Sequence, residues 1–262
     1  MNSGTSDADT AWVHEPLRFR EAGTGESFNV VGADTHSKRD GASEVIDRTL
    51  ESDLLIAGMK LRTFIALELP PLMRGQLAEW SRRQLPQHWP QGALRLLAAD
   101  NLHVTLRFLG ETEHGRLGEL MSGIDDLAPE HSAFGVATTE LGGFPTLRRA
   151  QAIWVGLHER EQEGVLRPLQ KEVEGLARRL GWHRQRQTFV PHVTLGRLGS
   201  RQHKGRFGEG GPPSVPDLGF EMTALTLFQS DLTPAGAHYR ALHRCAFGAA
   251  GPAGDPTPCS VS

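Results

Sequence analysis

The four residues His-Val-Thr-Leu occur twice in this 262-residue chain, at His103–Leu106 and at His192–Leu195. A repeat of this kind arises by accident on the order of a few per cent of the time. In an extended strand, residues i and i+2 project from the same face about 6–7 Å apart, so each copy presents an imidazole beside a hydroxyl. Two such strands facing each other would supply two imidazoles for acid–base chemistry and two hydroxyls that can hold an anionic oxygen.

This pairing of groups favours the cleavage of a phosphoester. Two imidazoles with ordinary pKa values near 6.5 can hold opposite protonation states at neutral pH, as concerted cleavage of a P–O bond requires. A strained cyclic phosphate can be opened without a metal if a base activates water, an acid protonates the departing oxygen and donors neutralise the growing charge. We therefore interpret His103 and His192 as the proton-transferring groups and Thr105 and Thr194 as donors to phosphate oxygens.

Three other interpretations of the repeat stay open. A single His-x-Thr can be a strand residue whose side chain is satisfied within the fold. Two histidines could belong to a metal site, but neither copy has an adjacent Asp, Glu or third His at a ligand spacing. A Thr hydroxyl could act as a nucleophile, although its neighbour at i−2 on the same strand is poorly placed to deprotonate it.

Composition indicates a soluble globular protein without a disulfide framework. The hydrophobic fraction of 38% is sufficient for a core, and the net charge of −3 gives no global attraction to nucleic acid. The two cysteines, Cys245 and Cys259, do not form a zinc-binding pattern, so we expect a cytoplasmic protein. The apolar run Leu54–Met59 is too short for a membrane span, and we expect no membrane partner.

The chain divides into three segments. Residues 1–58 are rich in Gly, Ser, Thr and Asp without a sustained period, so we expect them to be disordered or weakly structured. Residues 59–247 are expected to form the folded domain, and 248–262 a flexible Gly/Pro-rich tail. A further hypothesis is that Met59 is the true start of the protein, which N-terminal sequencing of the native chain would test.

Within the domain, strands and helices alternate. Period-two patterns predict strands at 61–69, 95–97, 102–109, 134–141, 152–157, directly after Pro191, 221–228 and 238–247, with a loop at Gly142-Gly143 and Pro145. Helical spacing of apolar residues predicts helices from Pro70-Pro71 onward, at 117–127 and at 165–180. The expected fold is α+β, with two pseudo-symmetric lobes, each a largely antiparallel sheet with outer helices, flanking a central cleft.

These segments resemble the two-histidine phosphoesterase superfamily, and within it the RNA 2′,3′-cyclic phosphodiesterases, also called 2′-5′ RNA ligases. Coverage runs from about residue 60 to 247, and the sequence departs from the family pattern in having Val between His and Thr. The segments that carry the resemblance are Arg62–Pro70, Asn101–Glu111, Phe189–Arg197, Leu225–Ser230 and Gly236–Leu242.

The resemblance implies hydrolysis of a terminal RNA 2′,3′-cyclic phosphate to a 2′-phosphate, and also reversible 2′-5′ ligation of tRNA halves. It implies that His103 is the proton donor to the 3′-oxygen and His192 the proton acceptor that activates water. Thr105 and Thr194 would hold the non-bridging oxygens, and Arg197 would contact phosphate or base. No metal or organic cofactor is implied. The expected partner is RNA with cyclic phosphate ends, including tRNA fragments, and we expect a monomer.

Other basic and aromatic residues are weaker candidates for RNA contacts. The Gly-rich loop after Arg197 and the pair that follows Phe144-Pro145 could grip phosphates or only solvate the surface. Phe64 could stack on a terminal base or belong to the core. Two alternative functions remain, a phosphodiesterase for a small cyclic nucleotide and a nucleotide- or RNA-binding module without turnover. The basic residues concerned are Arg148, Arg149, Arg201, His203, Lys204 and Arg206.

Overall fold

The computed structural model describes residues 58–160, 164–199, 207, 211–233 and 236–248. The segments predicted to be loose, 1–58 and 248–262, therefore fall almost entirely outside the described residues. No helix among the described residues is long and apolar enough to cross a membrane.

One sheet carries the first His-x-Thr copy. Its four strands follow the order β3-β1-β8-β9, and every neighbouring pair is antiparallel. The central strand β1 places Ile65 and Leu67 in the core with no exposed surface. The strands are β1 (Lys60–Glu68), β3 (His103–Glu113), β8 (Ala224–Thr233) and β9 (Gly236–Ala246).

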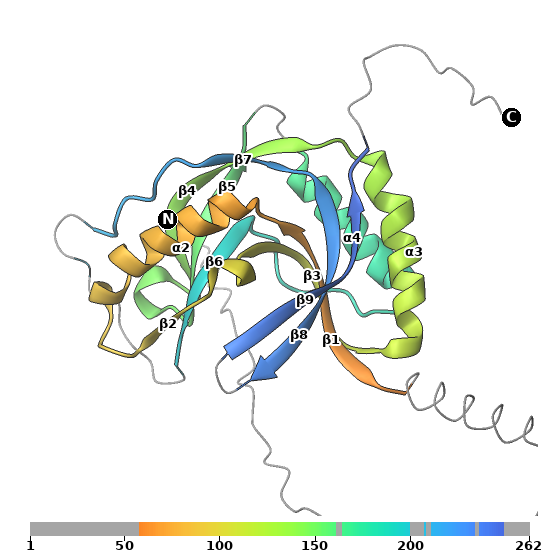
Figure 1. The fold of residues 1–262 in the computed structure, drawn as a ribbon, viewed down its shortest axis with the longest axis horizontal. Helices are drawn as coiled ribbons and strands as arrows, with labels where there is room; N and C mark the ends of the chain where they lie inside the picture. Colours follow the sequence, from red (N-terminus) through yellow and green to blue (C-terminus); the bar gives the residue numbers. More distant parts are fainter. Residues whose placement is uncertain (1–57, 161–163, 200–206, 208–210, 234–235, 249–262) are drawn as a thin grey trace, which may run out of the picture.

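The other sheet carries the second copy. Its five strands follow the order β2-β6-β5-β4-β7, again with antiparallel neighbours. β3 of the first sheet and β6 of the second lie against each other near the centre of the molecule (Figure 1). The strands are β2 (Leu94–Leu96), β4 (Phe134–Phe144), β5 (Ala152–Glu159), β6 (His192–Leu198) and β7 (Gly219–Met222).

Three α-helices cover the sheets: α2 (Pro71–Gln84), α3 (Leu117–Leu127) and α4 (Leu166–Arg179). α2 begins with Pro71 at its first turn, where the fixed φ of proline suits a helix and its missing N–H costs nothing. The carboxylate of Glu159 accepts hydrogen bonds from the backbone N–H groups of Gly164 and Leu166, which lie at the start of α4. The 3₁₀ turns are η1 (Pro86–His88), η2 (Ala99–Asn101), η3 (His114–Arg116), η4 (Ala128–Glu130) and η5 (Leu147–Arg149).

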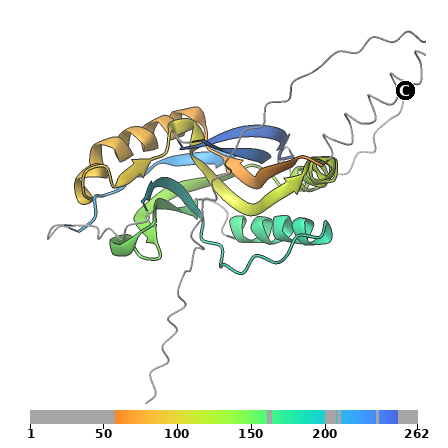
Figure 2. The ribbon, with the colours of Figure 1, turned by 90° about the horizontal axis from the view of Figure 1, so that it is seen from below.

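Two of the helices cross from one sheet to the other. α2 follows β1 of the first sheet but contacts β6 of the second, whereas α4 follows β5 of the second sheet and contacts β3 of the first. Figure 2 shows these two helices on opposite sides of the molecule, with the strands between them. Apolar residues of both sheets and all three helices form one continuous core.

The predicted fold class is confirmed, because both sheets are antiparallel and the helices lie outside them. Two details of the prediction are wrong. Gly142 and Gly143 belong to β4, where a Cβ on Gly142 would come within 2.1 Å of the Trp154 indole, so the glycine makes room for this ring. The strand expected at 221–228 is divided at Thr223: β7 pairs with β4, while β8 pairs with β1.

Candidate active site

The two motif strands have the same local structure. The segments His103–Leu109 and His192–Leu198 share one sequence of buried and accessible positions, with Val and Leu buried and His and Thr half-buried. In both strands the pairing register shifts directly after the Thr, so one residue, Leu106 or Leu195, is skipped. Such a β-bulge redirects the residues that follow it. Each copy therefore presents its His and Thr on one side of its strand, as the sequence predicts.

Backbone carbonyls orient both imidazoles in the same way. His103 Nδ1 lies 2.9 Å from the carbonyl oxygen of Asn101, and His192 Nδ1 lies 2.6 Å from that of Val190, in each case two residues earlier in the chain. A carbonyl can only accept, so Nδ1 carries the hydrogen and donates it. In both rings Nε2 is therefore the nitrogen left to exchange a proton with a ligand.

His103 is held on several sides. Its Nε2 lies 2.9 Å from the Thr105 hydroxyl oxygen, which donates to the neutral ring. The Asn101 side chain donates to the carbonyl of Ala237 at 2.7 Å, which connects this turn to β9. The His103 ring packs against Phe64, with ring centroids 4.7 Å apart, and Tyr239 meets it edge-on at 5.1 Å. These contacts fix the ring orientation.

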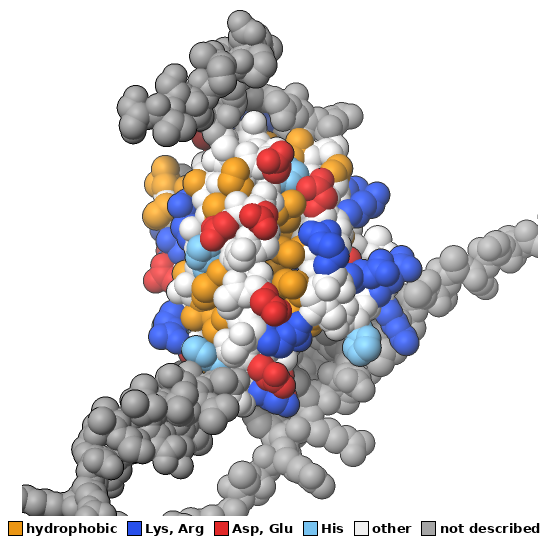
Figure 3. All heavy atoms as spheres, turned by 90° about the vertical axis from the view of Figure 1, so that its right-hand side faces the viewer, with side chains coloured by type: hydrophobic (Ala, Val, Ile, Leu, Met, Phe, Trp, Pro, Cys, Tyr) orange, Lys and Arg blue, Asp and Glu red, His pale blue; other side chains and the backbone are white. Residues whose placement is uncertain are grey.

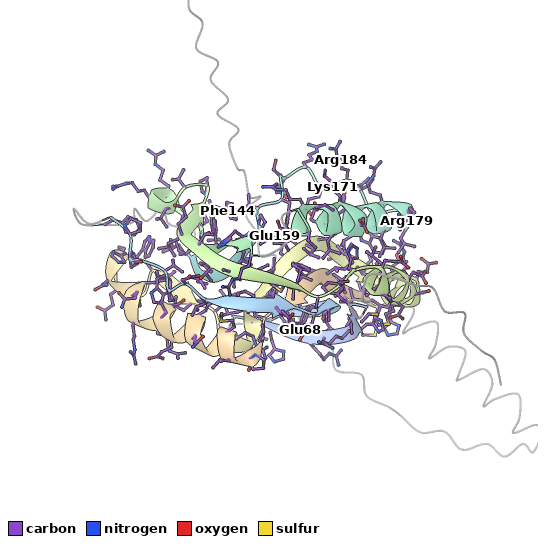
Figure 4. All side chains as sticks on the ribbon, turned by 90° about the horizontal axis from the view of Figure 1, so that it is seen from above. Glu68, Phe144, Glu159, Lys171, Arg179 and Arg184 are labelled. Carbon is purple, nitrogen blue, oxygen red and sulfur yellow. The ribbon has the colours of Figure 1, made fainter. Side chains whose placement is uncertain are left out.

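His192 has its own aromatic surroundings. Phe144 meets the imidazole edge-on with a centroid distance of 5.0 Å, and Trp154 lies at 5.6 Å. Figure 4 shows the labelled Phe144 on the sheet that carries β6, whereas Glu68 lies on the other sheet. The Trp154 indole is the ring that Gly142 accommodates. The second lobe thus holds its histidine with a different set of rings from the first.

The electrostatic environment links the two imidazoles. Burial is the main cause that lowers the pKa of His103 to about 4, and positive charge on His192 and Arg197 lowers it further. Burial also lowers the pKa of His192, again with a contribution from Arg197. A positive charge on His192 thus opposes protonation of His103. A ligand with negative charge would offset these repulsions and favour imidazolium.

Arg197 is exposed, yet its charge acts on both histidines and on Tyr239. The two histidines and Arg197 are therefore close enough for their charges to interact, and Thr105 and Thr194 lie on the same side of their strands as the histidines. Burial raises the pKa of Tyr239, so its hydroxyl stays protonated at neutral pH and can donate a hydrogen bond. Sequence reasoning missed Tyr239, Phe144 and Trp154, because aromatic residues in strands are usually core residues.

Other candidates from the sequence are placed differently. Phe64 is only 2% exposed and packs beneath the His103 ring, so the suggestion that it stacks on a terminal base is wrong. Arg148 and Arg149 are exposed on η5, between β4 and β5. The basic loop residues lie outside the described residues: Arg201, His203, Lys204 and Arg206. Within the described part of the chain, no group of three or more His, Cys, Asp or Glu residues is arranged to hold a metal ion.

Comparison with known proteins gives a consistent result. The family model described as LigT-like phosphoesterase matches residues 67–154 and 155–239, and each match contains one His-x-Thr copy. A protein of Methanothermobacter thermautotrophicus named RNA 2′,3′-cyclic phosphodiesterase is 27% identical over 183 residues, which cover 69% of this chain and 96% of that protein. A protein of Escherichia coli with the same name is 29% identical over 191 residues, covering 71% of this chain and 96% of its own.

The solved structures agree with the sequence relatives. The crystal structure of E. coli LigT complexed with 3′-AMP has a TM-score of 0.57 to this chain at 27% identity. The match covers 72% of this chain and 99% of that one. The remaining part of this chain is therefore additional to the shared fold.

Proposed function

This chain belongs to the LigT-like phosphoesterase family, and we propose that it hydrolyses a 2′,3′-cyclic phosphate at the end of an RNA to a 2′-phosphomonoester. The observation that carries the proposal is the pair of half-buried imidazoles, His103 and His192, each fixed through Nδ1 so that Nε2 is the nitrogen that can exchange a proton. The names of the relatives, which are RNA 2′,3′-cyclic phosphodiesterases, supply the substrate class.

The proposed reaction uses the two imidazoles in opposite senses. His192 Nε2 accepts a proton from water while the water oxygen forms a bond to phosphorus. The bond from phosphorus to the ribose 3′-oxygen breaks, and His103 Nε2 donates the proton that this oxygen needs. Thr105 and Thr194 hydroxyls donate to the non-bridging oxygens, and Arg197 stabilises the charge that accumulates there. The products are a 2′-phosphomonoester and a free 3′-hydroxyl.

The role of His103 requires its pKa to rise when the substrate binds. His103 must be protonated to act as the acid. The neighbouring positive charges and burial cause the low pKa of His103. A phosphodiester anion beside His103 Nε2 would oppose both causes and raise that pKa in the complex. We therefore propose that substrate binding itself favours protonation of His103.

The same pair can act without a metal and with a nucleophile other than water. Proton transfer and hydroxyl donation account for activation of water, departure of the 3′-oxygen and charge stabilisation, so we propose a metal-independent reaction. If the 5′-hydroxyl of a second RNA replaces water, attack on the cyclic phosphate forms a 2′-5′ phosphodiester and releases the 3′-hydroxyl. Ligation of tRNA halves is the corresponding candidate activity.

The test is incubation of the purified protein, in EDTA, with an oligoribonucleotide that ends in a 2′,3′-cyclic phosphate. We expect a 2′-phosphate as the product. A 3′-phosphate would overturn the assignment of the leaving oxygen, and activity that disappears in EDTA would overturn metal independence. A His158→Ala variant, which removes an exposed histidine of β5, serves as a control that should keep full activity.

Two outcomes would favour another function. Turnover of a 2′,3′-cyclic mononucleotide but not of the oligonucleotide would identify a phosphodiesterase for small cyclic nucleotides. Measurable binding of the oligonucleotide without any product would identify a binding module.

A further inference from the structure

Exposed basic residues gather on α4 and on the segment that leads from it to the second motif. Residues 164–189 contain two acidic residues, Glu172 and Glu174, although the whole chain has a net charge of −3. Glu174 pairs with Arg107 at 2.7 Å, and Glu172 lies 3.0 Å from His131 Nε2. The exposed basic residues are Arg167, Lys171, Arg178, Arg179, Arg184 and Arg186, which we call the α4 basic surface.

Several residues of the α4 basic surface lie on the same side of the helix. Because an α-helix turns every 3.6 residues, Arg167, Lys171 and Arg178 share one side of α4 and span about 16 Å along its axis. Figure 4 shows the labelled Lys171, Arg179 and Arg184 on the same outer side of this helix. In Figure 3 Lys and Arg side chains lie at both edges of this face, with the larger group on the right, while acidic side chains run across the centre of the view.

None of these six cations forms a salt bridge with a described carboxylate. The equivalent helix of the other lobe behaves differently. On α2, Arg74 pairs with Asp100 at 3.7 Å, and Arg82 and Arg83 both pair with Glu79 at 2.6 Å. α2 also borders an apolar cavity of about 680 Å³ with Pro216 and Leu218. The two helices have the same length, but the cations of α2 are paired with described carboxylates and those of α4 are not.

The α4 basic surface is connected to the active site. Arg167 Nη1 donates to the carbonyl of Phe189 at 3.1 Å, and the next residue, Val190, accepts the hydrogen bond that orients His192. On its other side α4 is tied to the first motif strand, because Gln170 and Glu174 bond to the backbone of Leu106 and to the Arg107 side chain. These contacts place α4 and its exposed cations next to the chain segments that carry both motifs.

We propose that the α4 basic surface binds the backbone phosphates of the RNA upstream of its cyclic phosphate end. The inference rests on the proposed function, since it assumes that the polymer in the site is RNA. Unpaired cations in a row match the repeated charge of a nucleic acid strand, and side chains that contact only phosphates bind without regard to sequence. The α4 basic surface would then favour longer RNA, whereas the two His-x-Thr motifs would recognise the cyclic phosphate at its end.

The test compares two triple variants with the same change in charge. One is Lys171→Gln, Arg178→Gln and Arg184→Gln on the α4 basic surface, and the control is Arg74→Gln, Arg82→Gln and Arg83→Gln on α2. Arg167 is left intact because it contacts the segment before His192. We expect kcat/KM for an RNA of about 12 nucleotides to fall about 10-fold or more in the α4 variant, and its dependence on log[salt] to weaken by about two units.

For a dinucleotide that ends in a cyclic phosphate, both variants should remain within about twofold of the parent protein, because too few phosphates reach α4. Equal losses in the two variants, or no loss in either, would overturn the proposal. So would a selective loss by the α4 variant of binding to vesicles of anionic lipid, with RNA binding unchanged.

Failure of the proposed catalytic function can be distinguished from failure of the proposed RNA-binding surface. If the parent protein does not turn over either RNA, the affinity for a labelled oligonucleotide that ends in a 2′-phosphate is measured instead. Weaker binding by the α4 variant alone would still support the surface, and equal binding by both variants would reject it.

Discussion

The two motif strands share His-Val-Thr-Leu but differ in the next two residues, which are Arg107-Phe108 in β3 and Gly196-Arg197 in β6. At the first of these positions Arg107 is buried and reaches α4, where its Nε lies 2.7 Å from Glu174 Oε2. Gly196 has no side chain because β2 packs closely on it: an added Cβ would lie 3.0 Å from the carbonyl oxygen of Arg95. The residue at this position therefore suits the element that packs on it, which is α4 in the first lobe and β2 in the second.

The second position differs at the surface. Phe108 is 49% exposed and its ring packs against Phe64, while Arg197 at the matching place brings a positive charge to both histidines. The residues that the copies share are therefore those proposed for proton transfer and phosphate binding. The residues that differ place a partly exposed aromatic ring on one motif strand and a cation on the other.

The largest expected effect separates the histidines by role. His103→Ala and His192→Ala should each reduce kcat/KM for the cyclic-phosphate RNA by about 10²- to 10⁴-fold. A substrate in which sulfur replaces the leaving 3′-oxygen needs no proton donor, so it should restore most of the rate to His103→Ala and little to His192→Ala. Rapid-quench assays with both substrates measure this, and equal rescue of both variants would contradict the assigned roles.

The next effect concerns stability and is specific to the first lobe. Arg107→Met leaves the partly buried Glu174 carboxylate without its charged partner and should lower the free energy of unfolding by about 3 kcal/mol. Urea denaturation of the variant measures this loss. Adding Glu174→Leu should recover most of it, and Arg197→Met, which alters the exposed arginine of the other copy, should change stability by less than about 1 kcal/mol. A stable Arg107→Met single variant would show that the ion pair does not hold α4.

The smallest effect concerns pH. Both histidines have pKa values below 6.5, so kcat/KM of the parent protein should be highest below pH 6.5 and fall as pH rises, because the acid form is lost. Arg197→Gln removes a positive charge that opposes protonation, so both pKa values rise and the alkaline limb moves to higher pH. KM should also increase about 10-fold. Phe108→Leu should leave both limbs in place, and a profile of Arg197→Gln that matches the parent would place Arg197 outside the site.

The sequence predicts most of the secondary structure because the signals are local. Alternation along β3 and β6 and the spacing of Leu169, Val173 and Leu176 on α4 depend only on which side of an element is buried. Pairing between strands is not local. Residues 219–233 look like one region of strand, but Met222 pairs in the second sheet and Leu225 in the first. No periodicity within the segment indicates that change of partner.

The features of the candidate site likewise divide into those that the sequence predicts and those that depend on the tertiary fold. The imidazoles and hydroxyls could be predicted, because a repeated motif of four residues is visible in the sequence. The carbonyls that orient them could not, since every residue carries a carbonyl and only the backbone path selects those of Asn101 and Val190. Tyr239 reaches His103 from a strand that begins more than a hundred positions later, so only the tertiary fold brings the two rings together.

The exchange of helices between the sheets has a consequence for how the site can fail. Each sheet is covered in part by a helix that follows a strand of the other sheet, because α2 contacts β6 of the second sheet and α4 contacts β3 of the first. The lobes are thus interlocked, and loosening one removes the cover of the other. The separation of the two imidazoles is then a property of the whole fold, maintained by its folding cooperativity and not by a hinge.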